Sequence, residues 1–299
     1  MVTPLKDTDT LDIAGIDRLI DHMLNADITG IFILGTTGEF AHISMKLREQ
    51  LIQRVCTQVN GRAKVLVGIS DTSVTQSQLL AQKAADHGAD ALVATPPYYY
   101  MQSQSEVAHH FVSLADRVPL PLFLYNMPVH TKVQVEPATV KQIFETSKNI
   151  IGLKDSSANM SYLRAVQFLM KDQDFPIFIG PEEMTADGVL LGAAGGVNGG
   201  ANMFPKLYVA QYETSINRDF DRLEIIRDKV LEISSLIYPV GKYGASSYLQ
   251  GLKSALSVLG LCDDYLPEPF QRLDLEGRKR IEMNLEKLEM AEFNRKYLD

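Results

Sequence analysis

Lys154 is the residue of this chain whose type and surroundings most directly suggest chemistry. It follows the apolar run Ile150-Ile151-Gly152-Leu153, a pattern typical of a buried β-strand. Because an unpaired ammonium group is very costly to bury, such a lysine needs either a partner or a lowered pKa. A lowered pKa supplies the neutral amine that attacks a carbonyl and forms a Schiff base. The alternative is a structural salt bridge, for example to the neighbouring Asp155.

Two further groups suit that chemistry. Tyr125 lies next to the end of the preceding strand-like run Leu120-Asn126, and a phenol beside the lysine would carry protons to and from the substrate. The segment Gly35-Thr36-Thr37-Gly38 forms a tight turn whose N–H groups and hydroxyls suit a carboxylate. The alternatives are an aromatic ring that packs at a strand end and an ordinary turn. Together the three features predict imine chemistry on a 2-oxo acid such as pyruvate.

The elements that would position these residues form a repeating pattern. Short apolar runs recur at intervals of mostly 26 to 34 residues, which is the size of one strand-helix-strand unit. We expect strands at Val2-Leu5, Ile28-Gly35, Ala63-Ser70, Ala89-Pro96, Leu120-Asn126, Ile150-Asp155, Pro176-Gly180 and Gly195-Asn198. Between them we expect helices such as Met45-Val59, Gln76-Gly88, Glu106-Val118, Pro137-Thr146 and Tyr162-Lys171. The pattern predicts an α/β fold, a (β/α)8 TIM barrel with its active site at the carboxyl ends of the strands.

The chain becomes wholly helical after about residue 204. Helices are expected at Leu207-Ile216, Phe220-Ile237, Ala245-Leu259 and Arg278-Met290. We therefore predict a barrel over residues 1–216 and a C-terminal helical extension over residues 217–299, both in one domain.

Residues at other strand ends have both a functional and a structural interpretation. Gly180 ends the seventh strand, and the following Glu182 and Glu183 could accept hydrogen bonds from a polyol or simply favour a helix N-terminus. The glycine-rich segment 192–200 suits either an anion nest in a phosphate-binding barrel or close packing. A metal-dependent barrel is disfavoured, because the six histidines form no known ligand motif. We predict no metal site.

Composition excludes several classes of partner. The net charge of −8 and a pI of about 5.3 argue against nucleic acid and anionic membranes. No secretory signal and no bilayer-spanning apolar run is evident. The two cysteines, Cys56 and Cys262, are interpreted as buried thiols of a reducing compartment. We expect a cytoplasmic protein with small-molecule partners.

The motifs together resemble a known enzyme family. Gly35-Thr36-Thr37-Gly38-Glu39, Thr95-Pro96-Pro97-Tyr98-Tyr99, Tyr125-Asn126-Met127-Pro128 and Gly152-Leu153-Lys154-Asp155 are similar to motifs of the dihydrodipicolinate synthase/N-acetylneuraminate lyase family of class I pyruvate aldolases. The resemblance extends from Val2 to about Leu261. It implies a homotetramer of (β/α)8 barrels with C-terminal helices. It also implies that no cofactor is needed besides the covalent imine on the lysine.

The resemblance also assigns roles to individual residues. Lys154 would be the Schiff-base lysine and Tyr125 the catalytic tyrosine. Gly35, Thr36 and Thr37 would serve the carboxylate and the proton relay. Tyr99 aligns with a tyrosine that, in the synthases, reaches into a neighbouring subunit's site, and the backbone of Val197 would face bound pyruvate.

Departures from the family pattern bear on the substrate. His130 occupies the position where the synthases carry an arginine that binds the aldehyde's carboxylate, and histidine lacks the full charge and the bidentate fork. The run Lys154-Asp155-Ser156 is more similar to 2-keto-3-deoxy sugar acid aldolases, and Gly180-Pro181-Glu182-Glu183 is similar to the neuraminate lyases. We therefore expect an aldolase that cleaves a 2-keto-3-deoxy sugar acid to pyruvate and an aldehyde. The alternatives are dihydrodipicolinate synthase, N-acetylneuraminate lyase, a carbon-oxygen lyase that uses the same imine for dehydration and, outside the enzymes, a sensor that binds a 2-oxo acid.

Overall fold

The computed structural model describes residues 1–241, 244 and 246–298. Residue 245, the first of the predicted helix 245–259, lies outside the described residues. The chain forms two compact units. Unit 1 comprises Met1–Ala63 and Asn198–Asp299, and unit 2 comprises Lys64–Val197.

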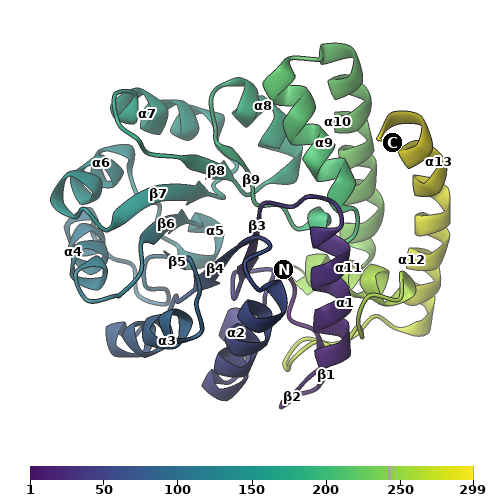
Figure 1. Ribbon diagram of the computed structural model, residues 1–299, viewed down its shortest axis with the longest axis horizontal. Helices are drawn as coiled ribbons and strands as arrows, with labels where there is room; N and C mark the ends of the chain where they lie inside the picture. Colours follow the sequence, from purple (N-terminus) through teal and green to yellow (C-terminus); the bar gives the residue numbers. More distant parts are fainter. Residues whose placement is uncertain (242–243, 245, 299) are drawn as a thin grey trace. The chain divides into compact units, whose positions relative to one another are not determined.

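Unit 2 alternates parallel strands with helices, as the sequence pattern predicts. Its strands are β4 (Lys64–Gly68), β5 (Ala91–Ala94), β6 (Leu122–Asn126), β7 (Ile150–Asp155), β8 (Ile177–Ile179) and β9 (Gly195–Gly196). They pair in this order and in parallel. The helices are α3 (Val74–Asp86), α4 (Gln104–Ala115), α5 (Pro128–Thr131), α6 (Pro137–Thr146), α7 (Met160–Met170) and α8 (Thr185–Leu190). In Figure 1, α3, α4, α6 and α7 cover the outer side of these strands.

The central strands of unit 2 are buried along their length. All five residues of β6 are buried, and so are five of the six in β7. Such continuous burial is expected of parallel strands that are covered on both faces. The register of β6 and β7 sets Tyr125 opposite Lys154. Two side chains predicted to act together therefore lie on adjacent strands at the same level.

Local capping sets the helix boundaries. Helix α6 begins at Pro137, as predicted, because proline is well suited to the first helical position. Helices α4 and α7 begin two residues before the predicted starts. In α4 the Ser103 side chain accepts a hydrogen bond from the Glu106 N–H in a reciprocal capping box, and in α7 Asn159 caps the Tyr162 N–H.

Unit 1 begins with a short antiparallel hairpin of β1 (Leu5–Asp7) and β2 (Thr10–Leu11). It continues with α1 (Ile13–Leu24), β3 (Gly30–Ile33) and α2 (Met45–Val59). The predicted first strand, Val2–Leu5, is wrong in its bounds, because strand structure begins only at Leu5. Pro4 lies in this segment, and proline cannot donate a hydrogen bond to a strand ladder.

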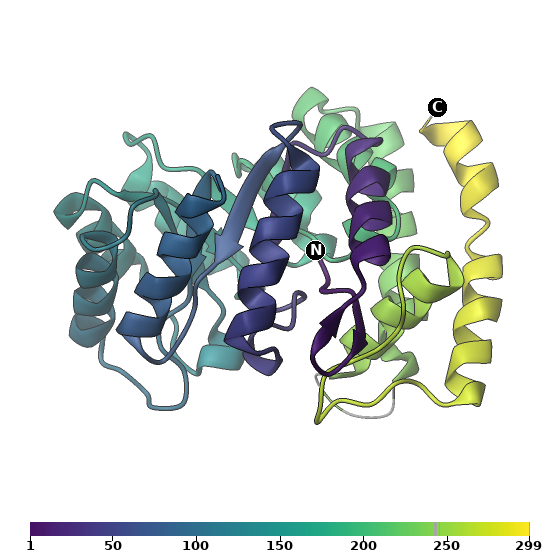
Figure 2. The same ribbon diagram turned by 60° about the horizontal axis from the view of Figure 1, so that its bottom comes forward.

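The C-terminal part of unit 1 is helical, as predicted. It contains α9 (Pro205–Asn217), α10 (Phe220–Ile237), α11 (Ser246–Val258), α12 (Leu275–Lys287) and α13 (Met290–Tyr297). The last predicted helix is divided into two, since Glu289 adopts a left-handed conformation with φ of 46°. Figure 2 shows α12 and α13 following one another at the end of the chain. Among the described residues, no helix is long and apolar enough to cross a membrane.

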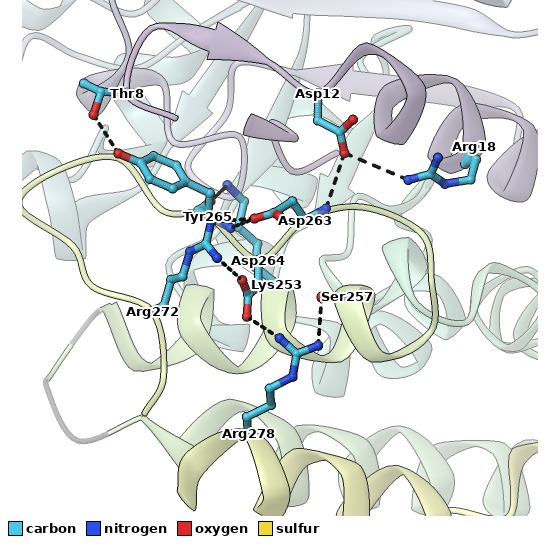
Figure 3. Close-up of polar contacts among 10 residues, drawn as sticks. All are labelled: Thr8, Asp12, Arg18, Lys253, Ser257, Asp263, Asp264, Tyr265, Arg272 and Arg278. Atoms are coloured by element: carbon cyan, nitrogen blue, oxygen red, sulfur yellow. Dashed lines mark hydrogen bonds and ion pairs between the residues drawn. The ribbon is translucent and has the colours of Figure 1, made fainter. Parts of the chain in front are cut away.

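An irregular segment joins α11 to α12 and is held by ion pairs. Arg272 contacts both Asp263 at 2.7 Å and Asp264 at 3.1 Å, and Arg278 contacts Asp264 at 3.1 Å. Figure 3 shows these contacts together with Lys253 of α11. Arg278 also donates a 3.3 Å hydrogen bond to the Ser257 hydroxyl of α11, so the loop, α11 and α12 are linked.

Candidate active site

Lys154 and Tyr125 form the centre of the candidate site in unit 2. Lys154 is only 7% exposed and Tyr125 only 3%. The Lys154 Nζ lies 3.9 Å from the centroid of the Tyr125 ring. This distance permits a cation–π interaction with a positively charged nitrogen. The structure thus brings together the amine and the phenol that the sequence singled out.

Ser156 and Gly180 also lie close to the Lys154 amine. The Lys154 Nζ donates a hydrogen bond of 2.8 Å to the Ser156 Oγ. Gly180, at the end of β8, lies against both residues. A Cβ atom on Gly180 would lie 1.9 Å from the Ser156 Oγ and 3.1 Å from the Lys154 Nζ. Glycine is therefore required here by the close approach of two side chains.

Asp155 contributes to the architecture of the strand ends. Its carboxylate accepts hydrogen bonds from the Asn126 Nδ2 at 2.9 Å and from the backbone N–H and the hydroxyl of Ser157, both at 3.0 Å. Asn126 in turn accepts a 3.1 Å bond from the Val135 N–H. Burial raises the pKa of Asp155, while its hydrogen bonds and the Lys154 charge oppose that shift. These bonds fasten the ends of β6 and β7 to each other.

The other predicted residues of unit 2 differ in their burial. Glu182, in the 3-10 helix η2 (Glu182–Met184), is buried, whereas Glu183 is half-buried. The N–H of Val197 donates a 2.8 Å hydrogen bond to the Ile179 carbonyl, so its backbone continues the β8–β9 pairing. Of this pair of glutamates, Glu182 is the more enclosed.

His130 and Tyr99 lie at the surface of unit 2. His130 is in the short helix α5 and is exposed, yet partial desolvation and then the charge of Lys132 lower its pKa. The Tyr99 side chain is 83% exposed and its φ is 89°. Tyr99 is therefore not part of the buried Tyr125–Lys154 pair of its own chain.

The Gly35-Thr36-Thr37-Gly38 turn lies in unit 1, after β3. The Thr37 hydroxyl is 3.2 Å from the Tyr248 hydroxyl, and Thr3 donates a 2.7 Å hydrogen bond to the Gly38 carbonyl. A Cβ on Gly38 would lie 2.9 Å from the Leu34 backbone nitrogen. The tightness of the turn thus explains its last glycine.

A buried ion pair follows directly after this turn. Glu39 and Lys253 of α11 are 2.6 Å apart, and both side chains are fully buried. Lys253 also donates a 2.7 Å hydrogen bond to the Tyr265 carbonyl, as Figure 3 shows. Burial raises the pKa of the Glu39 carboxyl, and the Lys253 ammonium opposes that shift. The pair connects the turn to α11.

Sequence reasoning missed Tyr248 and Lys253. Lys253 had a detectable signal, because it is a charged residue directly after Leu252 and two positions before Ala255-Leu256 in a helical segment. Tyr248 had none, since it is separated by 211 residues from the threonine that it contacts. Its position became evident only in the folded chain.

Comparisons with known proteins give a consistent result. The model of the "Dihydrodipicolinate synthetase family" matches residues 1–288. A "4-hydroxy-tetrahydrodipicolinate synthase" of Methanocaldococcus jannaschii is 29% identical over 96% of each chain. A "Probable 2-dehydro-3-deoxy-D-pentonate aldolase YjhH" of Escherichia coli is also 29% identical, over 92% of this chain and 91% of the relative.

Solved structures match the fold closely. One is the structure of a dihydrodipicolinate synthase from Bacteroides thetaiotaomicron, with a TM-score of 0.93 and 50% identity over 96% of each chain. Another is YagE from E. coli in complex with pyruvate, with a TM-score of 0.90 and 27% identity over 96% of each chain. These matches confirm the predicted α/β fold, a TIM barrel with C-terminal helices.

Proposed function

Because the chain belongs to the dihydrodipicolinate synthetase family, it is a Schiff-base-forming lyase, and we propose that it cleaves a 2-keto-3-deoxy sugar acid reversibly to pyruvate and an aldehyde. One observation carries the proposed catalytic centre. The Lys154 amine lies 3.9 Å from the ring of Tyr125, and both side chains are buried on adjacent strands. In this proposal the Lys154 amine is the nucleophile in imine formation.

The proposed reaction proceeds through a covalent imine. The neutral Lys154 amine attacks the C2 carbonyl of the 2-oxo acid, and water leaves to give a protonated imine. Tyr125 removes the proton from the C4 hydroxyl, the C3–C4 bond breaks, and the aldehyde departs. The bonding electrons pass to the iminium and form an enamine, which is then protonated at C3 and hydrolysed to release pyruvate. The Tyr125 ring stabilises the positive charge of the imine.

The family resemblance supports the remaining roles. We propose that Gly35, Thr36 and Thr37 bind the carboxylate of the 2-oxo acid and that the Val197 backbone faces it. In this proposal, Glu182 and Glu183 accept hydrogen bonds from the hydroxyls of the aldehyde portion.

His130 supports a sugar-type aldehyde rather than a carboxylated one. Its lowered pKa keeps the imidazole largely neutral near neutral pH. A neutral ring lacks the charge to bind the carboxylate of aspartate semialdehyde. The second candidate is dihydrodipicolinate synthase, which is favoured by the 50% identity with the B. thetaiotaomicron protein of that name.

The assembly and the location of the protein are also proposals. We propose a cytoplasmic homotetramer in which the exposed Tyr99 reaches a neighbouring subunit. The division into a barrel of residues 1–216 and an extension of residues 217–299 within one domain stays a prediction.

Borohydride trapping with pyruvate tests the central proposal. We expect a reduced adduct on the peptide that contains Lys154, identified by mass spectrometry, and none in the folded Lys154→Arg variant. A screen of deoxy sugar acids, N-acetylneuraminate, and aspartate semialdehyde with pyruvate then identifies the second substrate. Folded protein that yields no adduct with excess pyruvate would refute the imine. An adduct without turnover of any of these substrates would favour a 2-oxo-acid sensor.

The Tyr125→Phe variant separates imine formation from bond cleavage. The ring remains over the amine, so trapping should still occur. Loss of the phenol should lower kcat by about 10²- to 10⁴-fold, as is typical when a general acid–base group is removed. A kcat equal to that of the wild type would exclude Tyr125 as the proton carrier.

A further inference from the structure

We propose that Tyr248 is a positioning residue of the active site that holds the Thr37 hydroxyl through a hydrogen bond within one chain. The two hydroxyl oxygens are 3.2 Å apart. Tyr248 lies in the first turn of α11, which begins at Ser246. The inference rests on the role proposed above for Thr37 in carboxylate binding and proton relay.

The surroundings of Tyr248 indicate a built position for its phenol. A Cβ on Gly199 would lie 1.6 Å from the Tyr248 hydroxyl, so only glycine leaves room for it there. The ring packs edge-on against Tyr238, with centroids 4.7 Å apart. The glycine and the second aromatic ring therefore restrict where the hydroxyl can lie.

The same helix holds the turn at a second point. Lys253, five positions after Tyr248, forms the buried ion pair with Glu39, two positions after Thr37. Helix α11 thus contacts the turn through both its first part and its middle. A helix attached in this way can hold the phenol at a constant distance from Thr37.

This contact changes the interpretation of the proton relay. A tyrosine from another subunit is not needed to give the Thr37 hydroxyl a partner, because Tyr248 of the same chain provides one. A hydroxyl donates one proton and accepts through its lone pairs, so the contact with the phenol orients the Thr37 hydroxyl whichever of the two oxygens donates. Loss of the phenol should leave Thr37 in place but remove this constraint on the orientation of its hydroxyl.

A double-mutant cycle on the full-length enzyme tests this proposal. Tyr248→Phe keeps the ring and removes the hydroxyl, and Thr37→Val does the same for threonine. We expect Tyr248→Phe to lower kcat by about 2- to 12-fold, the range of one hydrogen bond, and to change the pH profile of kcat. In the Thr37→Val background, Tyr248→Phe should have little further effect. In a Thr37→Ser background, which retains a hydroxyl, its effect should persist.

Tyr208→Phe is the matched control, because the Tyr208 hydroxyl lies against Gly200, the next glycine in the chain. It should leave kcat unchanged. The proposal would be overturned if the fold-losses in kcat of Thr37→Val and Tyr248→Phe simply multiply in the double variant. It would also be overturned by a Tyr248→Phe variant with wild-type kcat and pH profile. A Thr37→Val variant with wild-type activity would also overturn it. Borohydride trapping on Lys154 is a separate measurement, so the proposed function can stand while this inference fails.

Discussion

At the scale of single residues, the Lys154 amine is closely surrounded. The Tyr125 ring, the Ser156 hydroxyl and the backbone of Gly180 all lie near it. If Lys154 is the nucleophile that we propose, an amine held in this way loses little entropy on reaching the substrate carbonyl, which is a recognised source of catalytic power.

Gly180→Ala should impair imine formation. The added methyl group would lie 1.9 Å from the Ser156 Oγ, so Ser156 or Lys154 must move. We expect pyruvate trapping to slow by about 10- to 100-fold, since small displacements of reacting groups carry costs of that order. The rate of borohydride trapping, measured by intact mass, checks this.

Ser156→Ala tests whether a clash with the Ser156 hydroxyl causes the defect of Gly180→Ala. In the double variant with Gly180→Ala, the oxygen is gone and the nearest remaining Ser156 atom is its Cβ, at 3.0 Å. The double variant should therefore trap pyruvate faster than Gly180→Ala alone. If it is slower, crowding by the hydroxyl is not the reason for the defect.

At the scale of elements, the ion pair between Glu39 and Lys253 is the clearest link between a loop and a helix. Removing one partner of a buried pair leaves an uncompensated charge, with a cost of about 3–5 kcal/mol. Lys253→Met should destabilise the protein by that amount near neutral pH, as measured by urea unfolding. Glu39→Gln with Lys253→Met should be more stable than Lys253→Met alone.

The pH dependence of Lys253→Met follows from the same pair. Burial already raises the pKa of Glu39, and loss of the ammonium raises it further. A carboxyl whose pKa is raised on folding contributes stability below its unfolded pKa and loses it as the pH rises through the folded pKa. The loss of unfolding free energy in Lys253→Met should therefore become smaller as the pH falls into the range where the Glu39 carboxyl is protonated. A deficit that grows in acid would contradict the assignment.

Helix α4 contains a second titrating group, whose effect on stability depends on pH in the opposite direction. His110 is buried, and burial followed by the charge of His109 lowers its pKa to about 4. A histidine with a lowered pKa stabilises the fold above its unfolded pKa of 6.5, and this contribution is lost as the pH falls toward about 4. Over that window the loss is on the order of 3 kcal/mol.

His110→Gln should remove this part of the pH dependence. The difference in unfolding free energy between the wild type and the variant should change by that amount between about pH 7.5 and pH 4.5. The measurement is urea unfolding at both pH values. His109→Gln is the control. It should retain most of the change in unfolding free energy between the two pH values, because the main cause of the pKa shift is the burial of His110. If the unfolding free energy of His110→Gln changes with pH as much as that of the wild type, the prediction is refuted.

At the scale of the whole molecule, three consecutive side chains suggest how subunits associate. Tyr99, Tyr100 and Met101 are 83%, 77% and 79% exposed. Large apolar and aromatic side chains of this kind are enriched in protein interfaces. Their presence next to the predicted strand end supports the proposed oligomer.

Tyr100→Ser combined with Met101→Ser should weaken the assembly. Sedimentation velocity should show the wild type as a multiple of the 33.3 kDa chain and the double variant at a lower mass. Met283→Ser is the control, because Met283 is also exposed, at 65%, but lies on α12. If both variants keep the wild-type mass, this segment is not an interface.

The sequence by itself determined the order of elements and singled out the pair of residues that we propose to be catalytic. Apolar runs and capping residues act over a few neighbouring positions, so β7, α2, α6 and α10 were predicted with their observed bounds. Lys154 and Tyr125 could be identified because both lie near the carboxyl ends of apolar strands, and parallel strands end at one edge. The proposed substrate class likewise rests on single residues such as His130.

Only the tertiary structure decided which distant groups meet. The contacts of Thr37 with Tyr248 and of Glu39 with Lys253 join residues more than 200 positions apart, and no local pattern encodes them. The need for glycine at position 180 is likewise a matter of close packing against Ser156. Such contacts depend on how elements pack in three dimensions, whereas periodicity and capping report only the local chain.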